Sequence, residues 1–201
     1  PGENAQRYFA KYNKQKRTFE ALTELIQETA DDIQYLESIS NALDIALSEA
    51  DLAQIKEELM QSGYIRRKHT KKKVKLTSKP MHYISSDGYD MYVGKNNLQN
   101  EELTFSFANG NDWWFHAKGA PGSHVIVKSG GDELPDRTFE EAARLAAYYS
   151  SMRGSDKVEI DYVEKKQVKK PNGAKPGFVV YYTNYSLVID SDISNIKNVQ
   201  D

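Results

Sequence analysis

Residues 3–62 contain neither proline nor glycine, the two residues that most readily interrupt a helix. Within this stretch, apolar side chains recur at alternating intervals of three and four residues, which is the heptad pattern of a coiled coil. They are Phe19, Leu22, Ile26, Ile33, Leu36, Leu43 and Leu47, and Thr29 and Ser40 occupy the remaining positions of the seam. A helix with one apolar seam is unstable alone in water and requires a partner. The pattern therefore predicts a long N-terminal coiled-coil helix.

The partner of this helix is left open by the sequence. It is either the second helix of an antiparallel hairpin, missing from this sequence, or a second copy of the chain. In the alternative interpretation, the stretch folds into a helical bundle within the chain. The sequence begins with Pro1 and Gly2 and leads directly into the helical pattern, so we expect it to be a piece cut from a longer protein.

Residues 48–64 carry the signals of a second, shorter helix. Ser48 and Asp51 have the spacing of a helix cap, and Gly63 is typical of a helix end. We therefore expect residues 1–64 to form a coiled-coil arm and a short helix.

The charge of the chain is segregated. Residues 1–64 contain 6 basic and 12 acidic side chains, residues 65–80 contain 8 basic and no acidic ones, and residues 81–201 contain 13 basic and 17 acidic ones. Only local basic patches can therefore support nucleic-acid binding. Residues 65–80 are interpreted as a linker that is either a solvated tether or a phosphate contact. The candidate phosphate contacts are Arg66, Arg67, Lys68, Lys71, Lys72 and Lys73.

The hydrophobic period changes to two after this linker, which is typical of β-strands. Residues 81–97 predict a hairpin with Asp87 and Gly88 at its turn, and residues 102–108 predict a further strand. Since the cysteine count is zero, disulfides and thiolate chemistry are excluded.

The C-terminal part adds one helix to these strands. Thr138 and Glu141 have the spacing of a capping box before an apolar stripe, and residues 178–192 predict two final strands joined near Asn184. We therefore expect residues 81–201 to form an α+β domain, a mainly antiparallel sheet with one packed helix.

The segment NDWWFHAKGAPGSHVIVK, residues 111–128, combines aromatic and basic side chains. Strand alternation places Trp113 and Phe115 on one face and Trp114, His116 and Lys118 on the other. If the strands on either side of the turn at residues 119–123 pair, one face forms a core and the other a platform. Aromatic rings stack on unpaired bases, so this platform predicts RNA binding centred on Trp114. In the alternative, both tryptophans are buried.

Other chemistry in this segment is less well supported. His116, His124 and Asp112 could form a metal site with two histidines and one carboxylate, but their spacing is not typical of one. Ser123 and His124 are adjacent and point to opposite faces of a strand, which disfavours a catalytic serine. We therefore expect no enzyme, metal or cofactor. A second basic patch is expected on one loop, at Lys165, Lys166, Lys169, Lys170 and Lys175.

Two long strings support a family resemblance. YVGKNNLQNEELTFSFANGNDWWFHAKGAPGSHVIVK and EEAARLAAYYSSMRGSDKVEIDYVEKKQVKKPNGAKPGFVVYY closely resemble the NFACT-R domain of the fibronectin-binding protein A family, bacterial relatives of the eukaryotic ribosome quality-control tailing factor. KYNKQKR, YLESI and IKEELMQSGYI resemble the end of that family's middle coiled coil. By this resemblance the motif positions are Lys95, Asn96, Asn97, Gln99, Asn100, Asp112, Trp113, Trp114, His116, Lys118, Gly122, Ser123 and His124. Lys95 stands where many relatives have arginine.

The resemblance implies a function in translation. Such proteins bind large ribosomal subunits that carry a stalled nascent chain, and they recruit tRNA so that a C-terminal alanine tail is added. The expected partners are therefore the large ribosomal subunit and tRNA in the cytoplasm, with this piece acting as the binding module. The alternative function is that of an anchorless adhesin that binds fibronectin. Such an adhesin would arrive at the cell surface without a signal peptide. No apolar run is long enough for a membrane span.

Overall fold

The structure is a computed structural model that describes residues 2–66 and 78–199. It consists of two compact units, residues 1–37 and 38–201. The first unit is the greater part of helix α1 (Gly2–Ile45), which confirms the predicted long helix. The predicted seam lies on its surface: Phe19 and Ile26 are 72% and 68% exposed. Among the described residues, no second helix covers these two side chains.

The second unit begins with the last turns of α1 and with α2 (Glu49–Gln61). The hydroxyl of Ser48 accepts the backbone N–H of Asp51, and the Asp51 carboxylate accepts the backbone N–H of Ser48, so the predicted cap is confirmed. Gly63 follows with a φ of 81°, in the left-handed region that glycine adopts freely. The sequence interpretation grouped α2 with the arm, whereas here it belongs to the unit that contains the sheet.

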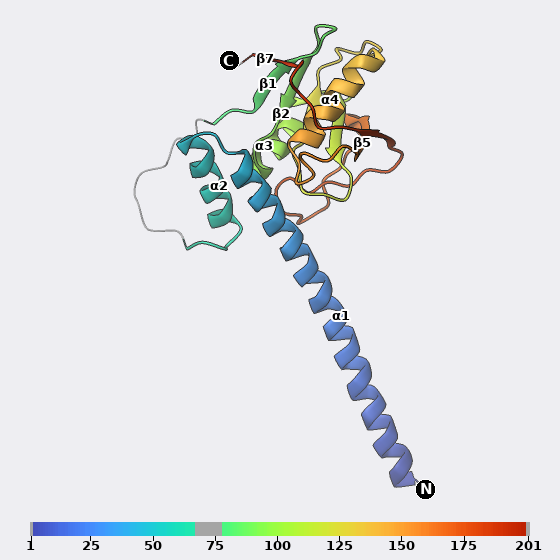
Figure 1. Ribbon diagram of the computed structural model, residues 1–201. Helices are drawn as coiled ribbons and strands as arrows, with labels where there is room; N and C mark the ends of the chain where they lie inside the picture. Colours follow the sequence, from blue (N-terminus) through green and yellow to red (C-terminus); the bar gives the residue numbers. More distant parts are fainter. Residues whose placement is uncertain (1, 67–77, 200–201) are drawn as a thin grey trace. The chain divides into compact units, whose positions relative to one another are not determined.

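The centre of this unit is one antiparallel sheet of seven strands, in the order β6-β5-β3-β4-β2-β1-β7 (Figure 1). The strands are β1 (Met81–Ile84), β2 (Asp90–Val93), β3 (Trp113–Ala117), β4 (Val125–Val127), β5 (Val158–Glu164), β6 (Tyr185–Ile189) and β7 (Lys197–Asn198). The predicted hairpin at Gly88 joins β1 to β2, and the predicted pairing across residues 119–123 joins β3 to β4.

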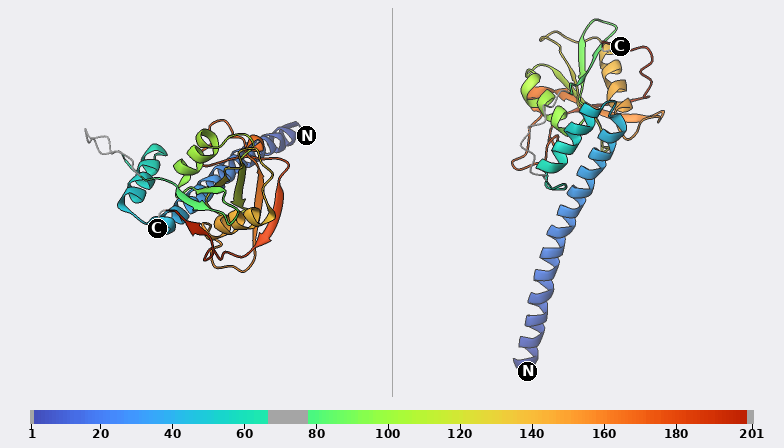
Figure 2. Two further views of the ribbon diagram at one scale, coloured as in Figure 1. Left: turned by 90° about the horizontal axis from the view of Figure 1, so that it is seen from above. Right: turned by 90° about the vertical axis from the view of Figure 1, so that its left-hand side faces the viewer.

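Helices cover both faces of the sheet. Figure 2 shows α4 (Asp136–Tyr148) on one side of the strands and α3 (Asn97–Glu102) on the other. Phe115 and Val125 pack in the larger core with α4. Trp114 and Ile126, their neighbours on the opposite face, pack in a second core with residues of the α3 side. The expected α+β class is confirmed, but the sheet has two buried faces rather than one.

Residues 102–108 were expected to form a strand, and this prediction is wrong. Asn96 caps α3 by accepting the backbone N–H of Gln99, and the helix continues into the one-turn π-helix η1 (Leu103–Phe107). The N–H of Ala108 closes this turn on the carbonyl of Leu103 at 2.9 Å. The alternating apolar residues of the segment fit the two-residue period of a strand only by coincidence.

Two C-terminal predictions also differ from the structure. Helix α4 begins at Asp136, before the expected cap. The two expected cap residues bind the β1–β2 turn instead: Thr138 donates its hydroxyl hydrogen to Asp87, and Glu141 accepts the backbone N–H of Ser86. Of the two final strands expected in residues 178–192, only β6 forms; Val180 makes an isolated bridge to Lys169.

Candidate nucleic-acid interface

Trp114 does not form an exposed platform. Its relative exposure is 0%, and its ring lies 5.6 Å from that of His116, 5.1 Å from that of His124 and 5.0 Å from that of Tyr181, centroid to centroid. The prediction of strand faces was correct, but the face that carries Trp114 is covered. The helical segment that was expected to be a strand supplies part of this cover, and an enclosed ring has no surface on which a base can stack.

The two histidines beside Trp114 are not placed to act as phosphate-binding cations. Burial lowers the pKa of His116 from 6.5 to about 4. Burial, followed by the neighbouring His116, also lowers the pKa of His124 well below its ordinary value. Nδ1 of His124 is hydrogen-bonded to the hydroxyl of Thr104 at 2.7 Å. Both rings are therefore neutral near pH 7.

Lys95 forms a buried ion pair with α2. Its Nζ lies 3.2 Å from Oδ1 of Asp51. Burial alone would raise the pKa of Asp51, but hydrogen bonds from Ser78, from the residues preceding α2 and from Lys95 outweigh it and hold this pKa below its ordinary value. The charge of Lys95 is thus engaged within the protein.

The amides that follow Lys95 also bind α2. Asn96 and Gln99 donate to the same side-chain oxygen of Gln54, at 2.8 and 2.7 Å. Asn97 donates to Glu58 at 2.8 Å. All three amide residues are buried. This part of the motif therefore docks a helix, and it offers no free amide to a ligand.

Asn100 connects the same motif to the β3–β4 connection. Its Oδ1 accepts the backbone N–H of His124 at 3.0 Å. A Cβ at Gly94 would lie 2.2 Å from this oxygen, so the position requires glycine. Ser123 is buried, and its N–H donates to the carbonyl of Tyr149 at 3.0 Å. These motif positions shape turns.

Asp112 and Lys118 are also engaged. Asp112 is buried, accepts the backbone N–H groups of Asn109 at 2.7 Å and Ser129 at 3.2 Å, and forms an ion pair with Lys128. Lys118 is exposed and forms an ion pair with Glu159 of β5. Of the three residues considered for a metal site, His116 and His124 lie with ring centroids 5.5 Å apart, whereas Asp112 is engaged with Lys128. No group of three metal-binding side chains occurs in the described ranges.

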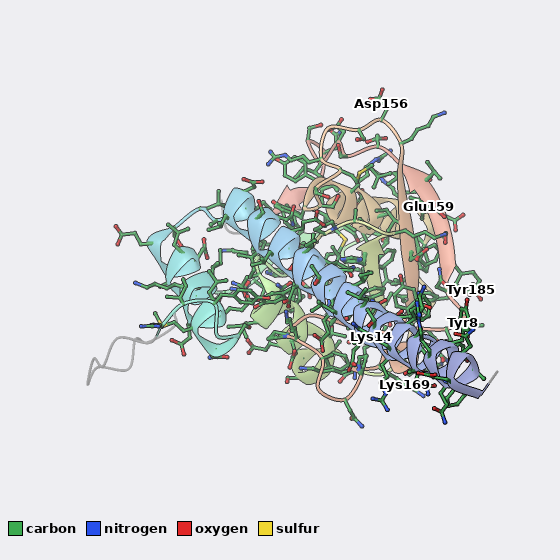
Figure 3. All side chains as sticks on the ribbon, turned by 90° about the horizontal axis from the view of Figure 1, so that it is seen from below. Tyr8, Lys14, Asp156, Glu159, Lys169 and Tyr185 are labelled. Atoms are coloured by element: carbon green, nitrogen blue, oxygen red, sulfur yellow. The ribbon has the colours of Figure 1, made fainter. Side chains whose placement is uncertain are left out.

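The lysine-rich loop lies at the surface. Lys166 and Lys170 form ion pairs with Glu164 and Glu101, and Lys169 is exposed (Figure 3). The other two lysines lie against aromatic rings: Nζ of Lys165 is 5.7 Å from the ring centroid of Phe105, and Nζ of Lys175 is 5.2 Å from that of Tyr64. Of the predicted linker contacts, Arg66 is exposed, and Arg67, Lys68, Lys71, Lys72 and Lys73 lie outside the described residues.

The sequence interpretation missed a second group of aromatic side chains on the sheet face that carries Trp114. His82 stacks on Tyr92 with ring centroids 4.5 Å apart, and Phe107 of η1 meets Tyr92 edge-on at 4.7 Å. Phe107 is 42% exposed. Asn96, a preferred N-cap residue, was the available signal that a helix and not a strand follows.

The comparisons with known proteins agree with this fold. The profile described as "NFACT protein RNA binding domain" matches residues 79–183, and that described as "NFACT N-terminal and middle domains" matches residues 1–78. The chain therefore belongs to the NFACT family. The resemblance inferred from the sequence is confirmed.

Individual relatives match the whole chain or nearly all of it. A protein named Rqc2 homolog RqcH from Streptococcus pneumoniae is 46% identical over 100% of this chain and 36% of its own length. The Bacillus subtilis protein of the same name is 40% identical over 98% of this chain and 34% of its own length. The chain thus spans about a third of these relatives.

A solved structure is similar as well. The C-terminal part of the fibronectin/fibrinogen-binding protein from Streptococcus suis matches with a TM-score of 0.87 and 45% identity, over 95% of this chain and 76% of that one. No helix in the described part of the chain is long and apolar enough to cross a membrane.

Proposed function

We propose that this chain is the RNA- and ribosome-binding part of a ribosome quality-control factor. It would bind stalled large ribosomal subunits and tRNA in the cytoplasm, while the rest of a longer protein supports C-terminal alanine tailing. The match of residues 79–183 to the family's RNA-binding domain carries the proposal. The chain contributes binding rather than catalysis, and no cofactor is required.

The lysine-rich loop is the first candidate for phosphate contact. It brings Lys165, Lys166, Lys169, Lys170 and Lys175 to one surface segment, and Lys175 donates to the hydroxyl of Tyr64, at 2.8 Å. Tyr64 lies just before the basic stretch of residues 65–80. Loop and linker can therefore act together on one phosphate backbone. With about six phosphate contacts, affinity should fall by roughly 10³ between 50 and 200 mM salt.

Co-sedimentation with purified large ribosomal subunits tests this function. We expect the chain to pellet with subunits at low salt and to be released at moderate salt. A variant with Lys165, Lys166, Lys169 and Lys170 changed to glutamine should not pellet. A matched control neutralises four exposed basic side chains elsewhere on the protein and should pellet like the unchanged chain. These are Arg137, Arg153, Lys157 and Lys197. No pelleting of the unchanged chain at any salt would contradict the proposal.

Fibronectin binding at the cell surface is a second candidate, favoured by the name of the Streptococcus suis relative and by one feature of the sheet. Strand β6 is an edge strand, and its Tyr185 and Val188 are each 61% exposed. Figure 3 shows Tyr185 on this outer strand, beside the β5 strand that carries Glu159. An extended peptide can add to such an edge through backbone hydrogen bonds.

Two separate variants, Leu187→Pro and Val188→Pro, test whether fibronectin pairs with the edge of β6. Successive residues of a strand direct their N–H groups to opposite sides, so one variant loses an outward N–H and keeps the pairing with β5. Edge pairing predicts that this folded variant loses fibronectin binding. Unchanged fibronectin affinity in the folded variant would contradict it.

A further inference from the structure

We propose that His82, Tyr92 and Phe107 form a stacking site for an unpaired RNA base. We call these three residues the aromatic surface. The proposal depends on the RNA-binding function proposed above, and it adds a second RNA-binding site that is separate from the lysine-rich loop.

The position of the aromatic surface follows from the strand register. Trp114 pairs with Ile126 on β4, Ile126 pairs with Tyr92 on β2, and Tyr92 pairs with His82 on β1. This row crosses one face of the sheet. Trp114 and Ile126 are fully buried, whereas Tyr92 and His82 are only partly buried. The face that the sequence indicated for RNA contact is thus covered at Trp114 and is partly exposed at its other end, at Tyr92 and His82.

The rings are already arranged for stacking. The planes of His82 and Tyr92 are parallel, with an interplanar angle of 0°, and Phe107 stands at 69° to Tyr92. Asp90 holds the His82 ring through Nε2 at 2.7 Å. Phe107 comes from the π-helix η1, a rare element that frequently occurs at functional sites. The exposed ring of Phe107 is therefore already held in position, so that binding a base costs little conformational entropy.

Charge favours a nucleic acid as the occupant. Lys165 stands over Phe105 on the same turn, and Nζ of Lys128, which pairs with Asp112, lies 4.9 Å from the Phe107 centroid. The nearby carboxylate of Asp112 is paired with Lys128, and that of Asp90 is hydrogen-bonded to the ring of His82. Aromatic rings flanked by lysines match alternating bases and phosphates, which is the pattern of single-strand binding surfaces.

Fluorescence anisotropy of the full chain with a short labelled oligouridine, and with a blunt RNA duplex, tests the proposal. Phe107→Ala should weaken oligouridine binding about tenfold, while duplex binding stays unchanged, because only the single strand offers a free base face. Phe107→Trp should retain the affinity. Tyr185→Ala, which removes an exposed aromatic ring from β6, is the matched control and should bind like the unchanged chain.

The outcomes separate this site from the general function. If Phe107→Ala binds oligouridine normally while the four-lysine variant does not, the stacking site is wrong and RNA binding by the loop stands. Equal weakening of oligouridine and duplex binding by Phe107→Ala also contradicts stacking. If the unchanged chain binds neither RNA, both proposals fall. Thermal unfolding of each variant shows that a lost affinity is not a lost fold.

Discussion

Residues 95–100 and residues 165–175 are both polar segments that were candidates for RNA contact, yet the first lies buried against α2 and the second lies at the surface. In the first, the amides of Asn96 and Gln99 are used on Gln54. In the second, Lys169 is exposed. The difference shows that a distinctive polar motif can serve to dock a helix, because a buried amide must find a partner within the protein.

The largest expected effect is the loss of stability when Trp114 is replaced, because a buried ring stabilises the fold whereas an exposed RNA-binding ring would not. Trp114→Ala should lower the free energy of unfolding by about 3–5 kcal/mol, because it removes a fully buried aromatic side chain. Chemical denaturation measures this. Tyr182→Ala, at an exposed position, should change stability by less than about 0.5 kcal/mol. A Trp114→Ala protein as stable as the unchanged chain would contradict the burial.

The second effect concerns the motif itself. Asp51→Asn leaves Lys95 without its buried partner and should cost about 3 kcal/mol of stability. The double variant Asp51→Asn/Lys95→Met should recover part of the loss, because no unpaired charge remains. Additive losses in this double-mutant cycle would mean that the two residues are not coupled.

The third effect is a pH dependence of stability. Burial lowers the pKa of His116 from 6.5 to about 4, so between these values the unfolded state binds more protons than the folded one. The stability that His116 contributes should therefore be fully present above pH 6.5 and be lost as the pH drops towards 4, by about 2 kcal/mol between pH 7 and pH 5. His116→Gln should remove this part of the slope in urea titrations and leave the part that His124, whose pKa is also lowered, contributes. A parallel profile in the variant would rule out His116 as the cause.

The smallest effect on stability is expected in the lysine-rich loop. Lys169→Gln should leave the unfolding free energy within about 0.5 kcal/mol of its original value, because the side chain is exposed. If Lys169 contacts a phosphate, the slope of log affinity against log salt should decrease by about one. RNA titrations at several salt concentrations measure the slope, and an unchanged slope would remove Lys169 from the interface.

The sequence was sufficient for features that depend on local pattern. The long helix α1, the Ser48 cap, the Gly88 hairpin and the two faces of β3 all follow from periodicity and from single capping or turn residues. The cover over Trp114 was missed because it depends on the helical state of residues 102–108. Their alternating pattern favours a strand, but the cap at Asn96 and packing of Leu103 and Thr104 against the sheet decide for a helix.

The candidate site was predicted unevenly for the same reason. Exposure of the lysine-rich loop follows from charge alone, since unpaired lysines are rarely buried. Burial of Asn97 and Gln99 could not be inferred locally, because their partners come from α2, about forty residues earlier in the chain. The aromatic surface requires the strand register and the position of η1 together.

The most direct test of this account is RNA affinity per folded molecule in two variants measured side by side. Gln99→Ala should lower the melting temperature and leave this affinity unchanged, because Gln99 holds α2. The four-lysine variant of residues 165–170 should keep the melting temperature and lose affinity at moderate salt. The reverse result, with RNA affinity lost in folded Gln99→Ala and kept in the lysine variant, would place the RNA interface on the buried motif and contradict the account.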